Sequence, residues 1–137
     1  MKVLGISIEA NKAIFSALEK DANQNMQEMS NAPKKLELKD HLDSEEVRSF
    51  LLELHTFLSK ETFDQVGIIT RGTKGRFAAS PISFKIEGLI QVFPNMKIEF
   101  VAPATLRAYF KKKENPIEPK YSYQKDACDL AFYLLKD

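Results

Sequence analysis

The segment FDQVGIIT, residues 63–70, restricts the possible folds more than any other part of the sequence. It is a short and nearly continuous apolar run, which is typical of a strand buried on both faces of a sheet. Helix-like segments come before and after it, so strands and helices alternate along the second half of the chain. Alternation of this kind implies parallel strands joined by right-handed crossovers. The sequence therefore predicts an α/β protein whose sheet is parallel in part.

The other elements follow from apolar periodicity and from turn residues. Strands are expected at residues 2–9, 13–20, 35–39, 63–70 and 97–101, with a long polar loop over residues 21–35. Helices are expected at residues 44–60, 80–93, 103–113 and 121–137. The first three strands are expected to form an antiparallel meander. We therefore predict a mixed five-stranded sheet with helices on both faces, in a single domain over residues 1–137.

Capping residues mark the starts of three of these helices. Asp43 or Ser44 can cap the first, because a side-chain oxygen there accepts a hydrogen bond from a free N–H of the first turn. Ser80 can cap the second, with Pro81 in its first turn. Ser122 is the candidate cap of the last helix.

Composition excludes several classes of protein. The formal net charge is +1, so there is no overall attraction to nucleic acid or to a membrane surface. Cys128 is the single cysteine, which rules out an intramolecular disulfide, and its apolar surroundings predict a small buried side chain rather than a catalytic thiol. His41 and His55 have no cysteine or histidine at zinc-ligand spacing. No apolar run approaches the length of a membrane span, and the N-terminus lacks a signal-peptide pattern. A soluble, cytoplasmic protein is expected.

Several segments resemble the ribonuclease H-like superfamily, and in particular its RuvC-type Holliday-junction resolvases. These are VLGISIE (3–9), the long segment from Ile68 to Phe93, VAPATLRAYF (101–110) and DACDLAFYLL (126–135). Over nearly its full length the chain also resembles a small bacterial family known as domain of unknown function 3010. That resemblance rests on KGRFA (74–78) and on SFK (83–85). Both resemblances imply a ribonuclease H-like fold, in agreement with the predicted element order.

The resemblance also implies a catalytic site. Nucleases of this superfamily hold two divalent cations with about four carboxylates, and the metals activate water and stabilise the leaving oxygen. Asp126 and Asp129 match the acids of the closing helix, where their spacing puts them on one face, and they are the candidate catalytic residues and ligands for Mg²⁺ or Mn²⁺. The first-strand position falls on Ser7, with Glu9 two residues further on the same face as a third candidate catalytic residue. The fourth-strand position falls on Thr70. The implied metal site is therefore reduced in charge.

Four basic residues are the candidates for binding nucleic acid or phosphate. Arg71, Lys74 and Arg76 belong to the loop that follows residues 63–70, and Lys85 lies in the helix after it. Cations at the carboxyl end of a parallel strand suit a phosphate ligand. The alternative interpretation is a solvated turn. The two aspartates likewise have an alternative, as surface acids that stabilise a helix N-terminus beside Lys125.

These observations leave three functions open. The first is a protein that binds or processes nucleic acid through a reduced metal site; the resemblance makes a homodimer plausible, and whether the chain is an enzyme stays open. The second is a non-catalytic interaction or scaffold protein that kept the fold and lost the active site. The third is a protein that binds a nucleotide or a small phosphorylated ligand. Fold alone does not decide among them.

Overall fold

A six-stranded mixed sheet forms the centre of the molecule. The computed structural model describes residues 1–72 and 80–136. The strands run in the order β3-β2-β1-β5-β6, and β4 also pairs with β2. Their bounds are β1 Lys2–Glu9, β2 Lys12–Lys20, β3 Met26–Glu28, β4 Lys35–Glu37, β5 Gln65–Ile69 and β6 Ile98–Val101. The β1–β2 pair is antiparallel, as are the pairs of β2 with β3 and β4, whereas β5 and β6 continue the sheet in parallel with β1.

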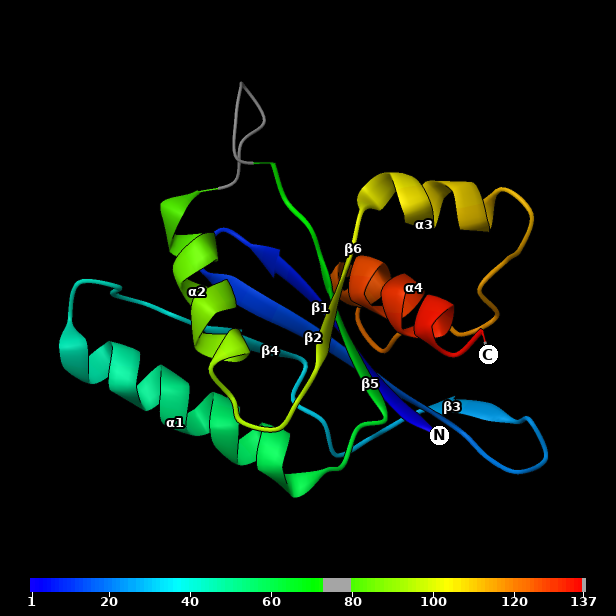
Figure 1. Ribbon diagram of the computed structural model, residues 1–137, viewed down its shortest axis with the longest axis horizontal. Coiled ribbons are helices and arrows are strands. Elements are labelled where there is room, and N and C mark those ends of the chain that lie inside the picture. Colours follow the sequence, from blue (N-terminus) through cyan, green and yellow to red (C-terminus); the bar gives the residue numbers. More distant parts are fainter. Residues whose placement is uncertain (73–79, 137) are drawn as a thin grey trace.

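Helices cover both faces of this sheet (Figure 1). Their bounds are α1 Ser44–Lys60, α2 Pro81–Gln91, α3 Pro103–Phe110 and α4 Lys125–Leu134. On one face, Leu4, Ile6 and Ile8 of β1 join a core with the buried residues of α1 and α2. On the other face, Val3 packs in a second core with α3 and α4. Because β1 packs in one core on each face, its sequence is apolar on both sides. None of the helices in the described part of the chain combines the length and apolar character that a bilayer span requires.

The predicted fold class is confirmed, with one strand more than expected. The polar sequence MQE forms β3 inside the segment that we expected to be a loop. It was missed because it has no apolar alternation, and it is held by antiparallel pairing with residues 18–20 of β2. The strand β4, at 35–37, pairs with residues 12–14 of β2. β3 and β4 therefore share one edge of β2.

Two of the predicted helix starts are confirmed and one is wrong. Asp43 caps α1 by accepting a hydrogen bond from the Glu45 N–H at 3.0 Å, and Ser80 caps α2 by accepting one from the Ser83 N–H at 3.3 Å. The last helix does not begin with a Ser122 cap. A 3₁₀ turn occupies Ser122–Gln124, without a side-chain hydrogen bond from Ser122 to the first turn, and α4 begins at Lys125.

Glycines let α4 lie directly on the sheet. A Cβ atom added to Gly5 would overlap the carbonyl oxygen of Ala127 and lie 2.8 Å from the amide nitrogen of Ala131. A Cβ on Gly67 would lie 3.0 Å from a methyl group of Leu134. The backbone of α4 thus approaches β1 as closely as atomic radii allow, and this approach fixes where the side chains of its first two turns lie.

Candidate functional site

The two aspartates of α4 lie at the carboxyl end of β5. Asp126 and Asp129 line a cavity of about 340 Å³, together with Ile69, the last residue of β5. Its other wall is α3, which contributes Pro103, Leu106, Arg107 and Phe110. In sheets of this kind, ligands bind outside the carboxyl ends of the parallel strands. The structure therefore brings the aspartates to the expected place and adds Arg107, which the sequence analysis missed.

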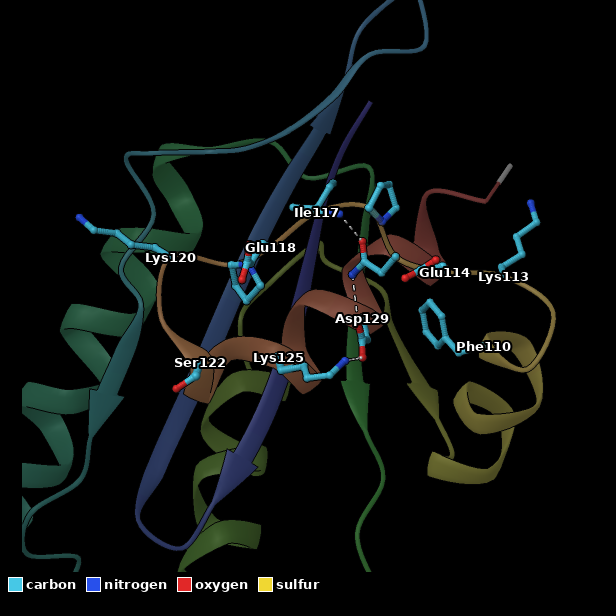
Figure 2. Close-up of a pocket in the computed structure, with 12 residues that line it drawn as sticks. Phe110, Lys113, Glu114, Ile117, Glu118, Lys120, Ser122, Lys125 and Asp129 are labelled. Carbon is cyan, nitrogen blue, oxygen red and sulfur yellow. Dashed lines mark hydrogen bonds and ion pairs between the residues drawn. The ribbon is translucent and has the colours of Figure 1, made fainter.

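Asp129 is engaged by two neighbours. Its Oδ1 accepts a hydrogen bond from Asn115 Nδ2 at 2.9 Å, and its Oδ2 accepts one from Lys125 Nζ at 2.8 Å. Figure 2 shows the Asp129 carboxylate with the Lys125 side chain reaching toward it. The hydrogen bond and the negative charge of Asp129 raise the pKa of Lys125. Asp129 is mostly buried, with 18% of its side chain exposed, whereas Asp126 lies on the surface.

Asn115 connects Asp129 to the irregular segment between α3 and the 3₁₀ turn, residues 111–121. Its Oδ1 accepts the Ile117 N–H at 2.9 Å, while its Nδ2 lies 3.6 Å from the Cys128 sulfur as well as bonding Asp129. Cys128 is fully buried, as predicted, and burial raises the pKa of its thiol. The sequence predicts neither a helix nor a strand between the predicted helices at 103–113 and 121–137, where two prolines occur. The Asn-Pro pair at 115–116, a turn signal, was the available indication that this segment is ordered.

This segment encloses a second, larger cavity of about 920 Å³ (Figure 2). Three cationic and three anionic side chains line it, namely Lys113, Lys120, Lys125, Glu114, Glu118 and Asp129. Phe110, Ile117 and two prolines add apolar surface. The balance of charge gives this cavity no marked preference for an anionic ligand.

The remaining positions of the implied metal site are not among the residues that line the 340 Å³ cavity with the aspartates. Ser7 is 7% exposed, and Glu9 is an exposed residue that pairs with Lys12 where β1 turns into β2. At the end of β5, Ile69 rather than Thr70 lines the cavity with the aspartates. Ile69 packs with the α3–α4 core, whereas its neighbour Ile68 packs in the core on the opposite face, as strand alternation requires.

The assembled residues do not fit a two-metal centre. Within residues 1–72 and 80–136, no three His, Cys, Asp or Glu side chains group closely enough to hold a metal ion. The sequence TKGRFAA at 73–79 contains no acid that would add to the set. Asp129, one of the two aspartates, already accepts hydrogen bonds on both carboxylate oxygens. A centre that needs about four converging carboxylates is not formed by these side chains.

The four predicted basic residues have different environments. Arg71 donates from Nη2 to Glu87 Oε1 at 2.6 Å, and its guanidinium lies 4.7 Å from the centroid of the Phe84 ring. Its side chain is 11% exposed, and burial lowers its pKa while the charge of Glu87 opposes that change. Arg71 is therefore held against α2 rather than presented to solvent.

Lys85 is also held by a neighbour within the protein. Its Nζ donates to the backbone carbonyl of His41 at 2.7 Å, beside a cavity of about 400 Å³ that Arg48 also lines. Lys74 and Arg76 lie outside the described residues. The described part of the chain therefore does not gather the predicted phosphate-binding residues into one patch.

Comparison with known proteins identifies the family and the fold. The family described as "Protein of unknown function (DUF3010)" matches residues 1–134. The chain belongs to the DUF3010 family. Among curated protein sequences, none matches this DUF3010 chain significantly.

Three solved structures that are similar to this DUF3010 protein are structures of resolvases. Thermus thermophilus RuvC is 12% identical with a TM-score of 0.68, and the match covers 96% of this chain and 91% of RuvC. RuvC from the same organism, in complex with a Holliday junction substrate, is 13% identical with a TM-score of 0.63, covering 96% and 90%. The fowlpox virus Holliday junction resolvase is 19% identical with a TM-score of 0.54, covering 98% and 94%. At these identities the likeness shows the ribonuclease H-like fold, which confirms the fold that the resemblance implied.

Proposed function

We propose that this DUF3010 protein binds nucleic acid at the carboxyl end of its parallel strands and does not cleave it by the two-metal mechanism. The observation that supports this most is the position of the 340 Å³ cavity, which lies where β5 ends and is lined by Arg107, Asp126 and Asp129. One solved structure of the same fold is a complex with a Holliday junction substrate. This likeness in fold supports nucleic acid as the class of ligand, and the position of the cavity supports this end of the sheet as the place, although fold alone does not establish a function.

The charges of the cavity residues and of the sequence that follows β5 together favour an anionic ligand. Lys125 pairs with Asp129, and Arg107 lines the same cavity as Asp126, so these four charges sum to zero. The chain between Gly72 and Ser80 adds Lys74 and Arg76 without any acid, immediately after β5. Arg and Lys bind phosphate oxygens through charge-assisted hydrogen bonds. The excess positive charge therefore comes from residues 73–79 of the sequence.

The same residues argue against metal-dependent hydrolysis. Two metals need several carboxylates that converge on one point, and here the converging acids are Asp126 and Asp129 alone among the described residues. The ammonium of Lys125 lies 2.8 Å from Asp129, where it would repel a divalent cation. Binding through the backbone of the nucleic acid needs none of this chemistry.

Fluorescence anisotropy with labelled four-way junction, duplex and single-stranded DNA and RNA tests the proposal. We expect binding that weakens steeply with salt, because each phosphate contact releases bound counterions. The double substitution Lys74→Ala/Arg76→Ala removes two such contacts. It should weaken binding by about tenfold or more at low salt and reduce the slope of log K against log salt by about 2.

The matched control is Lys60→Ala/Lys97→Ala. Both lysines are exposed. Lys60 ends α1 ahead of β5 and Lys97 precedes β6, so both lie toward the amino ends of the parallel strands, whereas the cavity lies at the carboxyl end of β5. The control should bind like the wild type. Absence of binding to every probe at low salt would contradict the proposal, as would an equal loss in the control variant.

A non-catalytic interaction protein is the second candidate. The balanced charges of the 920 Å³ cavity favour it, since protein interfaces tolerate mixed charge better than nucleic-acid sites do. A partner captured by the wild-type protein and equally by Lys74→Ala/Arg76→Ala would support this function over the first. Self-association as a homodimer is part of either proposal, and sedimentation equilibrium measures it.

A further inference from the structure

Two exposed tyrosines, which precede α4 in the sequence, stack on each other. The ring centroids of Tyr121 and Tyr123 are 5.4 Å apart, and the ring planes differ by 7°. The residues are 43% and 36% exposed, respectively. The exposed part of each ring offers apolar surface and a π face to a ligand, and tyrosine is enriched at binding interfaces for this reason.

Lysines from two separate elements lie over these rings. The Nζ atom of Lys35, in β4, is 4.9 Å from the Tyr123 centroid, and that of Lys120 is 5.5 Å from the Tyr121 centroid. The nearby acid, Glu28, accepts a hydrogen bond from the Lys120 N–H at 3.3 Å and lies 3.9 Å from Lys34 Nζ. Lys34 offsets Glu28, and Glu118 lines the same cavity as Lys120, so the local positive excess over the rings comes from Lys35. Both lysines over the rings are exposed and flexible enough to move from a ring to a phosphate.

A buried glutamine anchors the backbone that carries this tyrosine pair. Gln124 is 1% exposed; its Nε2 donates to the Phe15 carbonyl in β2 at 2.8 Å, and its Oε1 accepts the Tyr121 N–H at 3.0 Å. The 3₁₀ turn that carries Tyr123 is therefore tied to the central sheet. A preorganised platform of this kind loses little conformational entropy when a ligand binds.

We propose that Tyr121 and Tyr123 form a platform for the unpaired bases of single-stranded nucleic acid, with Lys35 and Lys120 binding the adjoining phosphates. Stacking on exposed aromatic rings beside cationic side chains is how proteins hold single strands without reading their sequence. Lys120 also lines the 920 Å³ cavity with Lys125 and Asp129, so the platform adjoins the start of α4. This inference rests on the proposed function and deepens it, since it assigns unpaired bases to this surface in addition to the site at the end of β5.

The test compares labelled single-stranded and duplex oligonucleotides in the same anisotropy assay. For Tyr121→Ala/Tyr123→Ala, we expect single-strand affinity to fall by about tenfold or more, which corresponds to losing the stacking of one base. Duplex affinity should change by less than about twofold, because paired bases are not free to stack on the rings. Tyr121→Phe/Tyr123→Phe keeps both rings and should bind single strands like the wild type.

A spectroscopic signal from the rings themselves makes the test independent of the variants' folding. The chain has no tryptophan, so tyrosine dominates its fluorescence, and stacked bases should quench it on binding. Tyr109 and Tyr133 remain in Tyr121→Phe/Tyr123→Phe, so the quenching that the wild type shows and this variant lacks comes from the pair. Phe100→Ala is the matched control, because Phe100 is 41% exposed on β6 at the other edge of the sheet. Lys35→Ala/Lys120→Ala is the second variant and should lower the salt dependence of single-strand binding.

The outcomes separate this inference from the proposed function. If single strands bind the alanine double variant as tightly as the wild type, and tyrosine emission is unchanged on binding, the inference is overturned and the pair is assigned to a protein contact. The proposed function would stand in that case, provided that Lys74→Ala/Arg76→Ala still weakens binding. If the wild type binds no nucleic acid at all, both are overturned.

Discussion

Replacement of Gly5 by alanine is expected to lower the free energy of unfolding by about 3 kcal/mol or more. The added Cβ would overlap the carbonyl oxygen of Ala127 and press on the amide nitrogen of Ala131. Both are backbone atoms of α4, so no side-chain rotation relieves the contact. The helix that carries Asp126 and Asp129 would have to move away from β1. Urea denaturation followed by circular dichroism measures the loss.

Gly88→Ala is the matched control for this prediction. Gly88 lies inside α2, and a Cβ added there meets no atom within 4 Å. Alanine is the better helix former by about 1 kcal/mol, so this variant should be as stable as the wild type or more so. If the two variants proved equally stable, α4 would not lie against β1 as closely as the structure shows.

The second large effect concerns the ion pair between Arg71 and Glu87. Glu87→Leu leaves the guanidinium mostly buried, 11% exposed in the wild type, without its carboxylate. Removing one partner of a buried pair typically costs 3–5 kcal/mol, and because both side chains keep some solvent contact we expect about 2–3 kcal/mol here. Burial already lowers the pKa of Arg71, and loss of the Glu87 charge would lower it further. Thermal and urea unfolding measure the change.

The double variant Arg71→Met/Glu87→Leu separates the ion pair from simple packing. With both charges removed, the apolar side chains can pack on the Phe84 ring, so the double variant should be more stable than Glu87→Leu alone. A double variant less stable than either single one would contradict this account. Because Arg71 contacts Glu87 and Phe84 of α2, its loss should affect stability more than nucleic-acid binding.

The order of strands and helices could be predicted because each main element has its own periodic signal. The apolar run at 63–70 marks a strand covered on both faces, and Asp43 and Ser80 mark helix starts that the structure confirms. The strand β3 has no such signal. Its polar residues take extended structure because the edge of β2 offers them backbone hydrogen bonds, and pairing across the sheet is not visible in a local pattern.

The candidate site was predictable where it depends on a single element. The spacing of Asp126 and Asp129 places both on one helical face, and both line the same cavity. Contacts between distant segments were not predictable. Asn115 reaches Asp129 from another part of the chain, and Arg71 turns toward Glu87 sixteen residues later instead of toward solvent. Burial of a charged side chain depends on a partner that only the tertiary structure supplies.

Incubation of a labelled four-way junction with the protein and Mg²⁺, analysed on native and denaturing gels, tests the central claim most directly. The account predicts a protein–junction complex on the native gel and an intact junction on the denaturing gel. Cleavage that requires Mg²⁺ and disappears in Asp126→Asn/Asp129→Asn would contradict it, by showing that the two aspartates do form a metal-dependent active site. Absence of any complex at low salt would contradict the proposed binding itself.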